Sequence, residues 1–346
     1  MNIPFTLIFI AVIATSLGIS ILRPFAISIN LVDKPNNRKK HKGFVPLIGG
    51  LAMFFGFLIT ILSSSIDLNE FKYFILASFI VVIVGALDDH RDMSVGFRIL
   101  FQLIAALIIA AVADINIVSL GDLLSREVIY LGSWSIFFTI ISIITAMNAV
   151  NMADGIHGLA GLNSLITFGS IAYLSFIALN EMGFVISILM CAVLLSFLVD
   201  NLCIFRSKSK RIFMGDAGSM FLGLVIALLL INLSQGETKV FNPVIALWLF
   251  AVPLIDIFST VTRRVIRGKS PFKPDRNHFH HILIQNGFSN ISVLFIMSSM
   301  SFLMAMIGIY GVITEIPEWK MFFGFMVLFV AYYFVSLLLI SKIKQI

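Results

Sequence analysis

Residues 71–94 read FKYFILASFIVVIVGALDDHRDMS, and this stretch decides the class of fold. Its first part, residues 71–87, is a nearly continuous apolar run with the length of a helix that crosses a lipid bilayer. A strand of a transmembrane barrel would instead alternate apolar and polar residues. Because the run ends at the adjacent Asp88 and Asp89, the stretch predicts a membrane helix with carboxylates at one surface of the bilayer.

The composition of the whole chain agrees with this interpretation. Hydrophobic residues make up 59% of the 346 residues, charged residues only 12%, and the mean hydropathy is +1.04. Soluble domains carry about 25% charged residues, so the composition excludes a soluble enzyme, a disordered protein and a coiled coil. We predict an all-α polytopic membrane protein that forms a single integral membrane domain over residues 1–346.

About eleven apolar runs are candidates for membrane-spanning helices. No basic residue precedes the first run, so we expect a retained helix rather than a cleaved signal peptide. The runs cover residues 4–22, 46–65, 71–87, 96–113, 134–147, 159–179, 184–199, 219–233, 241–261, 291–313 and 321–340.

The basic residues favour one orientation for these helices. If the N-terminus lies outside, all but four of the 24 Lys and Arg residues fall in loops on the inside. The positive-inside rule therefore predicts an N-terminus outside and a cytoplasmic C-terminus. The four exceptions are Lys72, Arg126, Lys239 and Lys320.

The acidic residues divide between the two faces by type. In the predicted orientation the inside face holds nine aspartates, no glutamate and all six histidines. A face of this composition is typical of a site for a metal ion and phosphate groups. Short polar loops also favour Asp and Asn in turns, and this alternative stays open, although it does not account for the missing glutamates.

The first inside loop, residues 31–50, carries a dense basic cluster that includes Lys40 and His41. Such a cluster either anchors the chain at anionic lipid or binds phosphate, and the loop by itself does not decide between them. Gly49 and Gly50 follow at the entry to the next apolar run, where they allow another backbone segment to approach closely.

The second loop contains a D-D-x-x-D pattern made by Asp88, Asp89 and Asp92. On a helix, this spacing brings the three carboxylates together, and they repel one another unless a cation lies between them. A hard divalent ion that also contacts phosphate oxygens is the natural candidate. The alternative is a solvated helix end neutralised by Arg91.

The third loop, residues 148–161, places Asn148, Asn151 and Asp154 along one helical face. Amide side chains near exposed backbone N–H groups suit a nucleobase or sugar hydroxyls. The alternative is a set of polar groups that join neighbouring helices inside the membrane.

The fourth loop leads into GDAGS, residues 215–219, at the expected start of a helix. A glycine-containing helix N-terminus offers N–H groups to an anion, and Asp216 there suits Mg²⁺ held against that anion. Helix capping by Asp216 or Ser219 is compatible with this role.

The fifth loop, residues 263–287, carries the histidines His278, His280 and His281. We favour phosphate contact or proton transfer near neutral pH over structural zinc, because no thiolate or glutamate completes a zinc site. Asp256 lies seven residues before Arg263, on the same helical face, and is interpreted as its buried ion-pair partner.

Five segments taken together resemble the polyprenyl-phosphate N-acetylhexosamine-1-phosphate transferases, in particular their bacterial WecA-type branch. They are VDKPNNRKKHKGFVPLIGG (32–50), LDDHRDMS (87–94), NAVNMADGIHGLAG (148–161), FMGDAGS (213–219) and SPFKPDRNHFHH (270–281).

The resemblance implies transfer of GlcNAc-1-phosphate from UDP-GlcNAc to undecaprenyl phosphate, which gives undecaprenyl-diphosphate-GlcNAc and UMP. This reaction is the first membrane step of a surface polysaccharide such as O-antigen, common antigen or a wall polymer. The resemblance also implies Mg²⁺, or Mn²⁺, as the cofactor. It places the protein in the bacterial cytoplasmic (inner) membrane with the site on the cytoplasmic face. The protein is expected to bind membrane lipid but no nucleic acid, and a homodimer is compatible with the resemblance.

The resemblance also assigns roles to individual residues. The implied catalytic residues are Asp88, Asp89, Asp154, His278 and His281. The implied substrate-binding residues are Lys40, His41, Asn148, Asn151, His157, Phe213, Arg276 and His280. The implied metal ligands are Asp216, Asp88 and Asp89.

One position departs from the family pattern. The family has D-G-x-D-G, whereas His157 stands here in place of the second acid. The site works with this change if His157 donates a hydrogen bond to uracil or phosphate; the change otherwise marks a different UDP-N-acetylhexosamine or lower activity. A multi-pass transporter and a membrane scaffold without activity stay open as alternatives of other classes.

Overall fold

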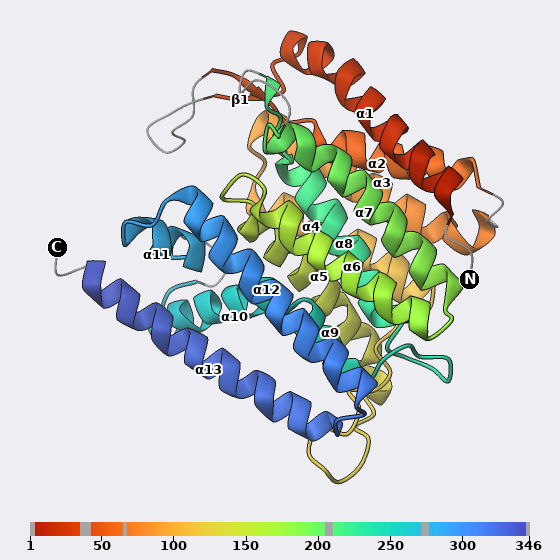
Figure 1. Cartoon of the computed structure of the whole chain (residues 1–346), viewed down its shortest axis with the longest axis vertical. Helices are drawn as coiled ribbons and strands as arrows, with labels where there is room; N and C mark the ends of the chain where they lie inside the picture. Colours follow the sequence, from red (N-terminus) through yellow and green to blue (C-terminus); the bar gives the residue numbers. More distant parts are fainter. Residues whose placement is uncertain (1–3, 35–42, 65–67, 205–209, 271–276, 344–346) are drawn as a thin grey trace.

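The computed structural model describes residues 4–34, 43–64, 68–204, 210–270 and 277–343. Helices dominate this part of the chain, which confirms the all-α prediction (Figure 1). The helices are α1 (Phe5–Ser28), α2 (Gly49–Leu62), α3 (Leu68–Arg91), α4 (Val95–Leu107), α5 (Ser135–Ala153), α6 (Leu159–Ile177), α7 (Glu181–Asn201), α8 (Gly215–Asn232), α9 (Pro243–Leu249), α10 (Ala251–Ile266), α11 (Phe279–Gln285), α12 (Asn290–Ile313) and α13 (Glu318–Ile343).

Nine helices in the described residues are long and apolar enough to cross a membrane, or up to ten if α9 and α10 count as one bent span. Helix α2 is apolar but shorter. The protein is therefore a polytopic membrane protein, as the composition predicts. The start of α1 and the end of α13 lie at opposite ends of the helix bundle (Figure 1). The count of eleven crossings and the orientation stay predictions.

Three elements differ from the runs read off the sequence. The ninth run is broken near Phe250, where α9 and α10 meet at an angle of 87°. The fifth run extends to Ala153, because polar Asn148 and Asn151 lie inside the helix. Helix α11 forms within the fifth loop, where no helix was assigned. Apolar periodicity carries no signal for these features.

Helix α8 forms the centre of the bundle. All its residues from Ala217 to Ile231 are buried, and it packs against α2, α3, α5 and α6. A helix that is apolar all round has to be surrounded in this way. Close approach depends on missing side chains: a Cβ on Gly50 would meet the backbone of Gly218, and one on Gly85 would meet Ala217. The predicted backbone approach at Gly50 is thus confirmed.

Two short strands, β1 (Val32–Asp33) and β2 (Val45–Pro46), pair antiparallel just before α2. The segment before α8 adds to them: the N–H of Phe213 donates to Pro46 O at 2.9 Å, and the N–H of Gly49 donates to Phe213 O at 2.9 Å. These hydrogen bonds fix Phe213 and the start of α8 beside the first loop.

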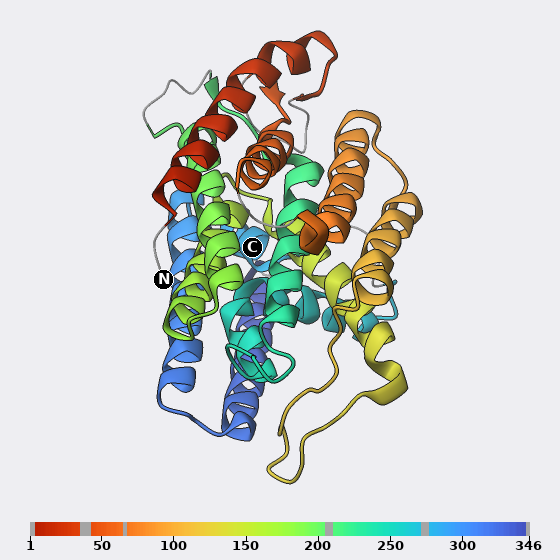
Figure 2. The ribbon, with the colours of Figure 1, turned by 90° about the vertical axis from the view of Figure 1, so that its right-hand side faces the viewer.

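The connection between α4 and α5 lies at the other end of the bundle, because α4 runs away from the start of α8. It extends beyond the ends of the helices (gold, bottom of Figure 2). Ser119 pairs with Tyr130 across it, and Gln235 accepts hydrogen bonds there from the N–H groups of Val118 and Ser119. This end holds none of the predicted site residues.

Candidate active site

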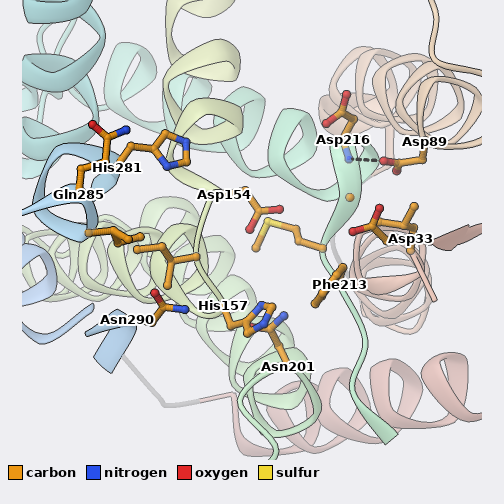
Figure 3. A pocket seen from close by; sticks show the side chains of 16 residues that line it. Asp33, Asp89, Asp154, His157, Asn201, Phe213, Asp216, His281, Gln285 and Asn290 are labelled. Atoms are coloured by element: carbon orange, nitrogen blue, oxygen red, sulfur yellow. Dashed lines mark hydrogen bonds between the residues drawn. The ribbon is translucent and has the colours of Figure 1, made fainter. Parts of the chain in front are cut away.

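The ends of α3 and α5, the start of α8 and the short helix α11 surround a cavity of about 680 Å³. In Figure 3, Asp89 and Asp216 lie on one side, His281 and Gln285 on the opposite side, and Asp154 between them. The polar lining residues are Asp33, Asp89, Asp154, His157, Asn201, Asp216, His281, Gln285 and Asn290.

The carboxylate of Asp89 caps the N-terminus of α8. Its Oδ1 accepts the N–H of Asp216 at 2.9 Å, and its Oδ2 accepts the N–H of Ala217 at 3.4 Å (dashed in Figure 3 for Asp216). A negative group is stabilised at this position by the partial positive charge of the helix end. The anion predicted at this helix start is therefore supplied, at least in part, by the chain itself.

The side chain of Asp216 is held by two partners from other helices. Its Oδ1 accepts a hydrogen bond from Asn151 Nδ2 at 2.7 Å, and its Oδ2 pairs with Arg98 Nη1 at 3.0 Å. The same Nη1 pairs with Asp88 Oδ2 at 2.9 Å. One guanidinium nitrogen is thus shared between two of the predicted metal ligands.

Sequence reasoning missed Arg98 as a site residue. The available signal was a charged residue inside an apolar run, one turn after Ser94 caps the start of α4. A charge inside a membrane helix is costly and therefore has a partner or a function.

The expected convergence of Asp92 with Asp88 and Asp89 is wrong. Helix α3 ends at Arg91, and Asp92 adopts a left-handed conformation with φ 49° and an exposed side chain. The spacing argument holds only while the helix continues, so it applies to the adjacent pair and fails one residue past the helix end.

The donor set suits a divalent cation such as magnesium. Asp88 and Asp216 contribute carboxylate oxygens on either side of Arg98, and Asp89 lies against the backbone of Asp216. Mg²⁺ is usually bound by one or two carboxylates and completed by water and substrate phosphates. Among the described residues, no three His, Cys, Asp or Glu side chains are grouped to hold a metal by themselves. The residues therefore fit magnesium shared with a phosphate substrate better than a closed site such as structural zinc.

Asp154 follows the last residue of α5 and faces the cavity. Burial, and in second place the negative charge of Asp216, raise the pKa of its carboxyl group well above the usual value. In the folded protein Asp154 therefore keeps its proton to a higher pH than in the unfolded chain.

This shift predicts a pH-dependent effect of Asp154→Asn on stability. Between the ordinary Asp pKa of about 3.9 and the raised value, the folded state binds more protons, so stability falls as pH rises. Above that window the charged Asp154 destabilises the fold. We expect Asp154→Asn to raise Tm by about 1–3 °C at pH 8, with the difference shrinking toward pH 4.

The measurement is thermal unfolding in detergent with EDTA, using Asp92→Asn as the matched control because Asp92 is exposed. An Asp154→Asn variant that is no more stable than the wild type at pH 8 would contradict the prediction.

His157 and Phe213 form an aromatic pair on the cavity wall. Their ring centroids are 4.9 Å apart and the planes are 26° from parallel. The residue that departs from the family pattern is therefore stacked on a neighbouring predicted substrate-binding residue.

The three histidines occupy different environments. His281 lines the cavity, while His278 and His280 are 5% and 1% exposed and lie behind it. The His280 ring packs against Gly155, and both its nitrogens lack a hydrogen-bond partner among the described residues. Burial, followed by repulsion from His281, lowers the pKa of His280 to about 3. His280 is therefore neutral at physiological pH.

The remaining predicted residues lie apart from the cavity or outside the described residues. Asn148 donates to Gln102 Oε1 and Ile144 O, both at 2.8 Å, and does not line the cavity. Lys40, His41 and Arg276 fall outside the described residues. Four polar lining residues were not predicted, because amides and one acid in loops or at helix ends have no distinctive spacing: Asp33, Asn201, Gln285 and Asn290.

Asp256 is not the partner of Arg263. Its Oδ2 pairs with His278 Nδ1 at 2.9 Å, while Arg263 donates to the hydroxyls of Ser259 and Ser336. A seven-residue separation places two side chains on one helical face but two turns apart, so each contacts a different part of the fifth loop: Asp256 contacts His278 and Phe279, and Arg263 contacts Asn277.

A helical membrane bundle with carboxylates and histidines around one cavity, and an arginine paired with one of those carboxylates, is typical of an integral membrane enzyme of phosphate chemistry. Comparison with known proteins identifies the family of enzymes to which the chain belongs. The profile of glycosyl transferase family 4 matches residues 71–234. The chain belongs to this family and is a phosphosugar transferase, which confirms the resemblance carried by the five motifs.

The relatives match along nearly the whole chain. An undecaprenyl-phosphate α-N-acetylglucosaminyl 1-phosphate transferase of Haemophilus influenzae is 38% identical over 331 residues, covering 94% of this chain and 92% of the relative. Its namesake from Pasteurella multocida is 39% identical, covering 93% and 92%. The namesake from Escherichia coli K12 is 33% identical, covering 92% and 87%.

Proposed function

We propose that this protein transfers GlcNAc-1-phosphate from UDP-GlcNAc to undecaprenyl phosphate, giving undecaprenyl-diphosphate-GlcNAc and UMP. The observation that carries the proposal is the cavity, which places Asp89 and Asp216 opposite His281, with Asp154 between the two sides. Its volume of about 680 Å³ lies in the range of small-molecule sites. The names of the relatives support the choice of acceptor and sugar.

In this reaction an oxygen of the lipid phosphate forms a bond to the sugar-bearing phosphorus of the donor. The bond from that phosphorus to the bridging oxygen breaks, and UMP leaves with the electron pair. Both substrates are anions, so catalysis depends on positioning and on positive potential. Arg98 and the N-terminus of α8 already face the carboxylates of Asp88, Asp89 and Asp216, so a bound divalent cation and the basic loops would supply this potential.

Mg²⁺ is the proposed cofactor, with Mn²⁺ as the alternative. Asp216 would hold it, with Asp88 and Asp89 beside Asp216. When bound, the ion neutralises diphosphate charge as it builds on the leaving group. Asn151, which donates to both Asp216 Oδ1 and Ser219 Oγ, keeps the Asp216 carboxylate in place.

We further propose that the site faces the cytoplasm in a bacterial inner membrane. The basic loops support this orientation, because the positive-inside rule puts them in the cytoplasm together with the loops that hold the site. Their positive charge would also raise the local concentration of both anionic substrates.

The test is UMP release by the purified protein with undecaprenyl phosphate, Mg²⁺ and a panel of UDP-N-acetylhexosamines. We expect lipid-dependent UMP from UDP-GlcNAc that EDTA abolishes. Release from a different UDP-sugar alone would keep the chemistry and identify His157 as a specificity position, to be tested by His157→Asp. No release from any donor by folded protein would overturn the proposal.

A further inference from the structure

Behind the cavity wall, a buried carboxylate joins α10, α11 and α13. Asp256 on α10 is 5% exposed, and its Oδ1 accepts the N–H of Phe279 at 2.9 Å and the hydroxyl of Tyr332 at 3.0 Å. Its Oδ2 pairs with His278 Nδ1 at 2.9 Å. One carboxylate thus binds the first residue of α11, the residue before it and the last long helix of the chain.

Helix α11 depends on this contact for its N-terminal cap. It has only seven residues, and its own N-cap residue, His278, makes no side-chain capping hydrogen bond. The first N–H groups of a helix need acceptors, and Asp256 supplies one of them from another helix. Arg263 adds a second connection, because its guanidinium donates to Asn277 O at 2.6 Å and to Ser336 Oγ on α13 at 2.7 Å.

The short helix fixed in this way carries part of the cavity wall. His281, Ile284 and Gln285 of α11 line the cavity, and His280 packs against Gly155, next to Asp154. His280 and His281 both belong to α11, and their ring centroids are 4.0 Å apart. A shift of α11 therefore moves both rings. A displacement of about 1 Å near reacting groups costs about 10²-fold in rate.

We propose that Asp256 is a positioning residue of the transfer reaction, which holds His278 and the start of α11 so that His281 faces the substrates. Tyr332 completes the arrangement by fixing the Asp256 carboxylate. Neither Asp256 nor His278 lines the cavity, so both act through α11 and not by contact with substrate. The inference rests on the proposed function for its kinetic consequence, but the contact itself is testable without activity.

The kinetic test compares three variants in the UMP assay. We expect Asp256→Asn to lower kcat/KM for UDP-GlcNAc by about 10–100-fold, as for other residues that orient a functional histidine. Tyr332→Phe should lower it by about 3–10-fold. Tyr333→Phe is the matched control, because it removes a phenol hydroxyl from the neighbouring residue of α13. Its kcat/KM should stay within about twofold of the wild-type value. The KM for undecaprenyl phosphate should stay unchanged in all three.

The spectroscopic test uses ¹⁵N-histidine NMR of the full chain in lipid nanodiscs without substrate. The wild type should show a slowly exchanging, low-field Nδ1 proton that is lost in Asp256→Asn and in an assigning variant, His278→Asn. The Tyr333→Phe spectrum should retain this proton. If Asp256→Asn does not fold, Tyr332→Phe takes its place in both the kinetic and the NMR test. We then expect a reduced kcat/KM and a shifted His278 Nδ1 signal for Tyr332→Phe.

Two results would overturn the inference: folded Asp256→Asn with wild-type kcat/KM, or a wild-type spectrum without the His278 Nδ1 proton. Failure of the proposed function is recognised separately, because wild-type protein would then release no UMP while the NMR arm still reports on Asp256.

Discussion

Asp216→Asn should reduce UMP release by at least about 10²–10³-fold, the cost of removing one preorganised charge from a transition-state site. The side chain is held from α4 by Arg98 and from α5 by Asn151. The amide keeps the shape of the carboxylate but removes its negative charge, so the proposed divalent cation would lose the ligand that we assign to Asp216. Calorimetry with Mg²⁺ and UDP should accordingly show weaker binding of the metal.

Asp92→Asn is the matched control for this prediction. Asp92 lies beyond the end of α3 with an exposed side chain, so its variant should keep activity within about twofold. Equal activity of Asp216→Asn and wild type would remove Asp216 from the site. An equal loss of UMP release in the two variants would instead support the sequence-based prediction that Asp92 belongs to the site with Asp88 and Asp89.

Gly215→Ala should both destabilise the protein and inactivate it. Gly215 has φ +71°, and a Cβ there would meet the carboxylate of Asp89, which caps α8. The left-handed backbone costs about 1–2 kcal/mol for alanine, and a lost cap costs about 0.5–2 kcal/mol. We expect Tm to fall by about 2–5 °C. Activity should fall by about 10²-fold, because Asp216 is the next residue.

Gly96→Ala should have the opposite effect on stability. Gly96 lies in the first turn of α4, and a Cβ there would meet nothing within 4 Å. Alanine in a helix is favoured over glycine by about 0.5–1 kcal/mol, so Tm should rise slightly and activity should persist. A Gly215→Ala protein as stable as Gly96→Ala would show that Asp89 does not need the space above Gly215.

The apolar runs predicted most of the fold because membrane helices are selected by length and hydropathy. The break between α9 and α10 escaped this reasoning, since residues 243–255 on both sides of Phe250 contain no polar or charged residue. Helix α11 was not predicted because it has only seven residues and its N-terminal N–H group is capped by Asp256 from another helix.

The site was predicted in its residue types more than in its contacts. Spacing along one helix identified the adjacent Asp88 and Asp89, but it did not show that Asp89 serves α8. Arg98, Asn151 and Asp216 come from three helices that only the folded bundle brings together. Long-range pairing of this kind leaves no periodic signal in a single sequence.

The 87° break at Phe250 lies beside a backbone carbonyl whose hydrogen-bond donor comes from another helix. The residue four positions after Leu249 is Pro253, which has no N–H to donate to the Leu249 carbonyl. The hydroxyl of Thr167, in the middle of α6, donates to that oxygen at 2.9 Å instead. Hydrocarbon offers no other donor. Since α6 precedes α9 in the chain, the ribosome makes the donor before the carbonyl that accepts its hydrogen bond.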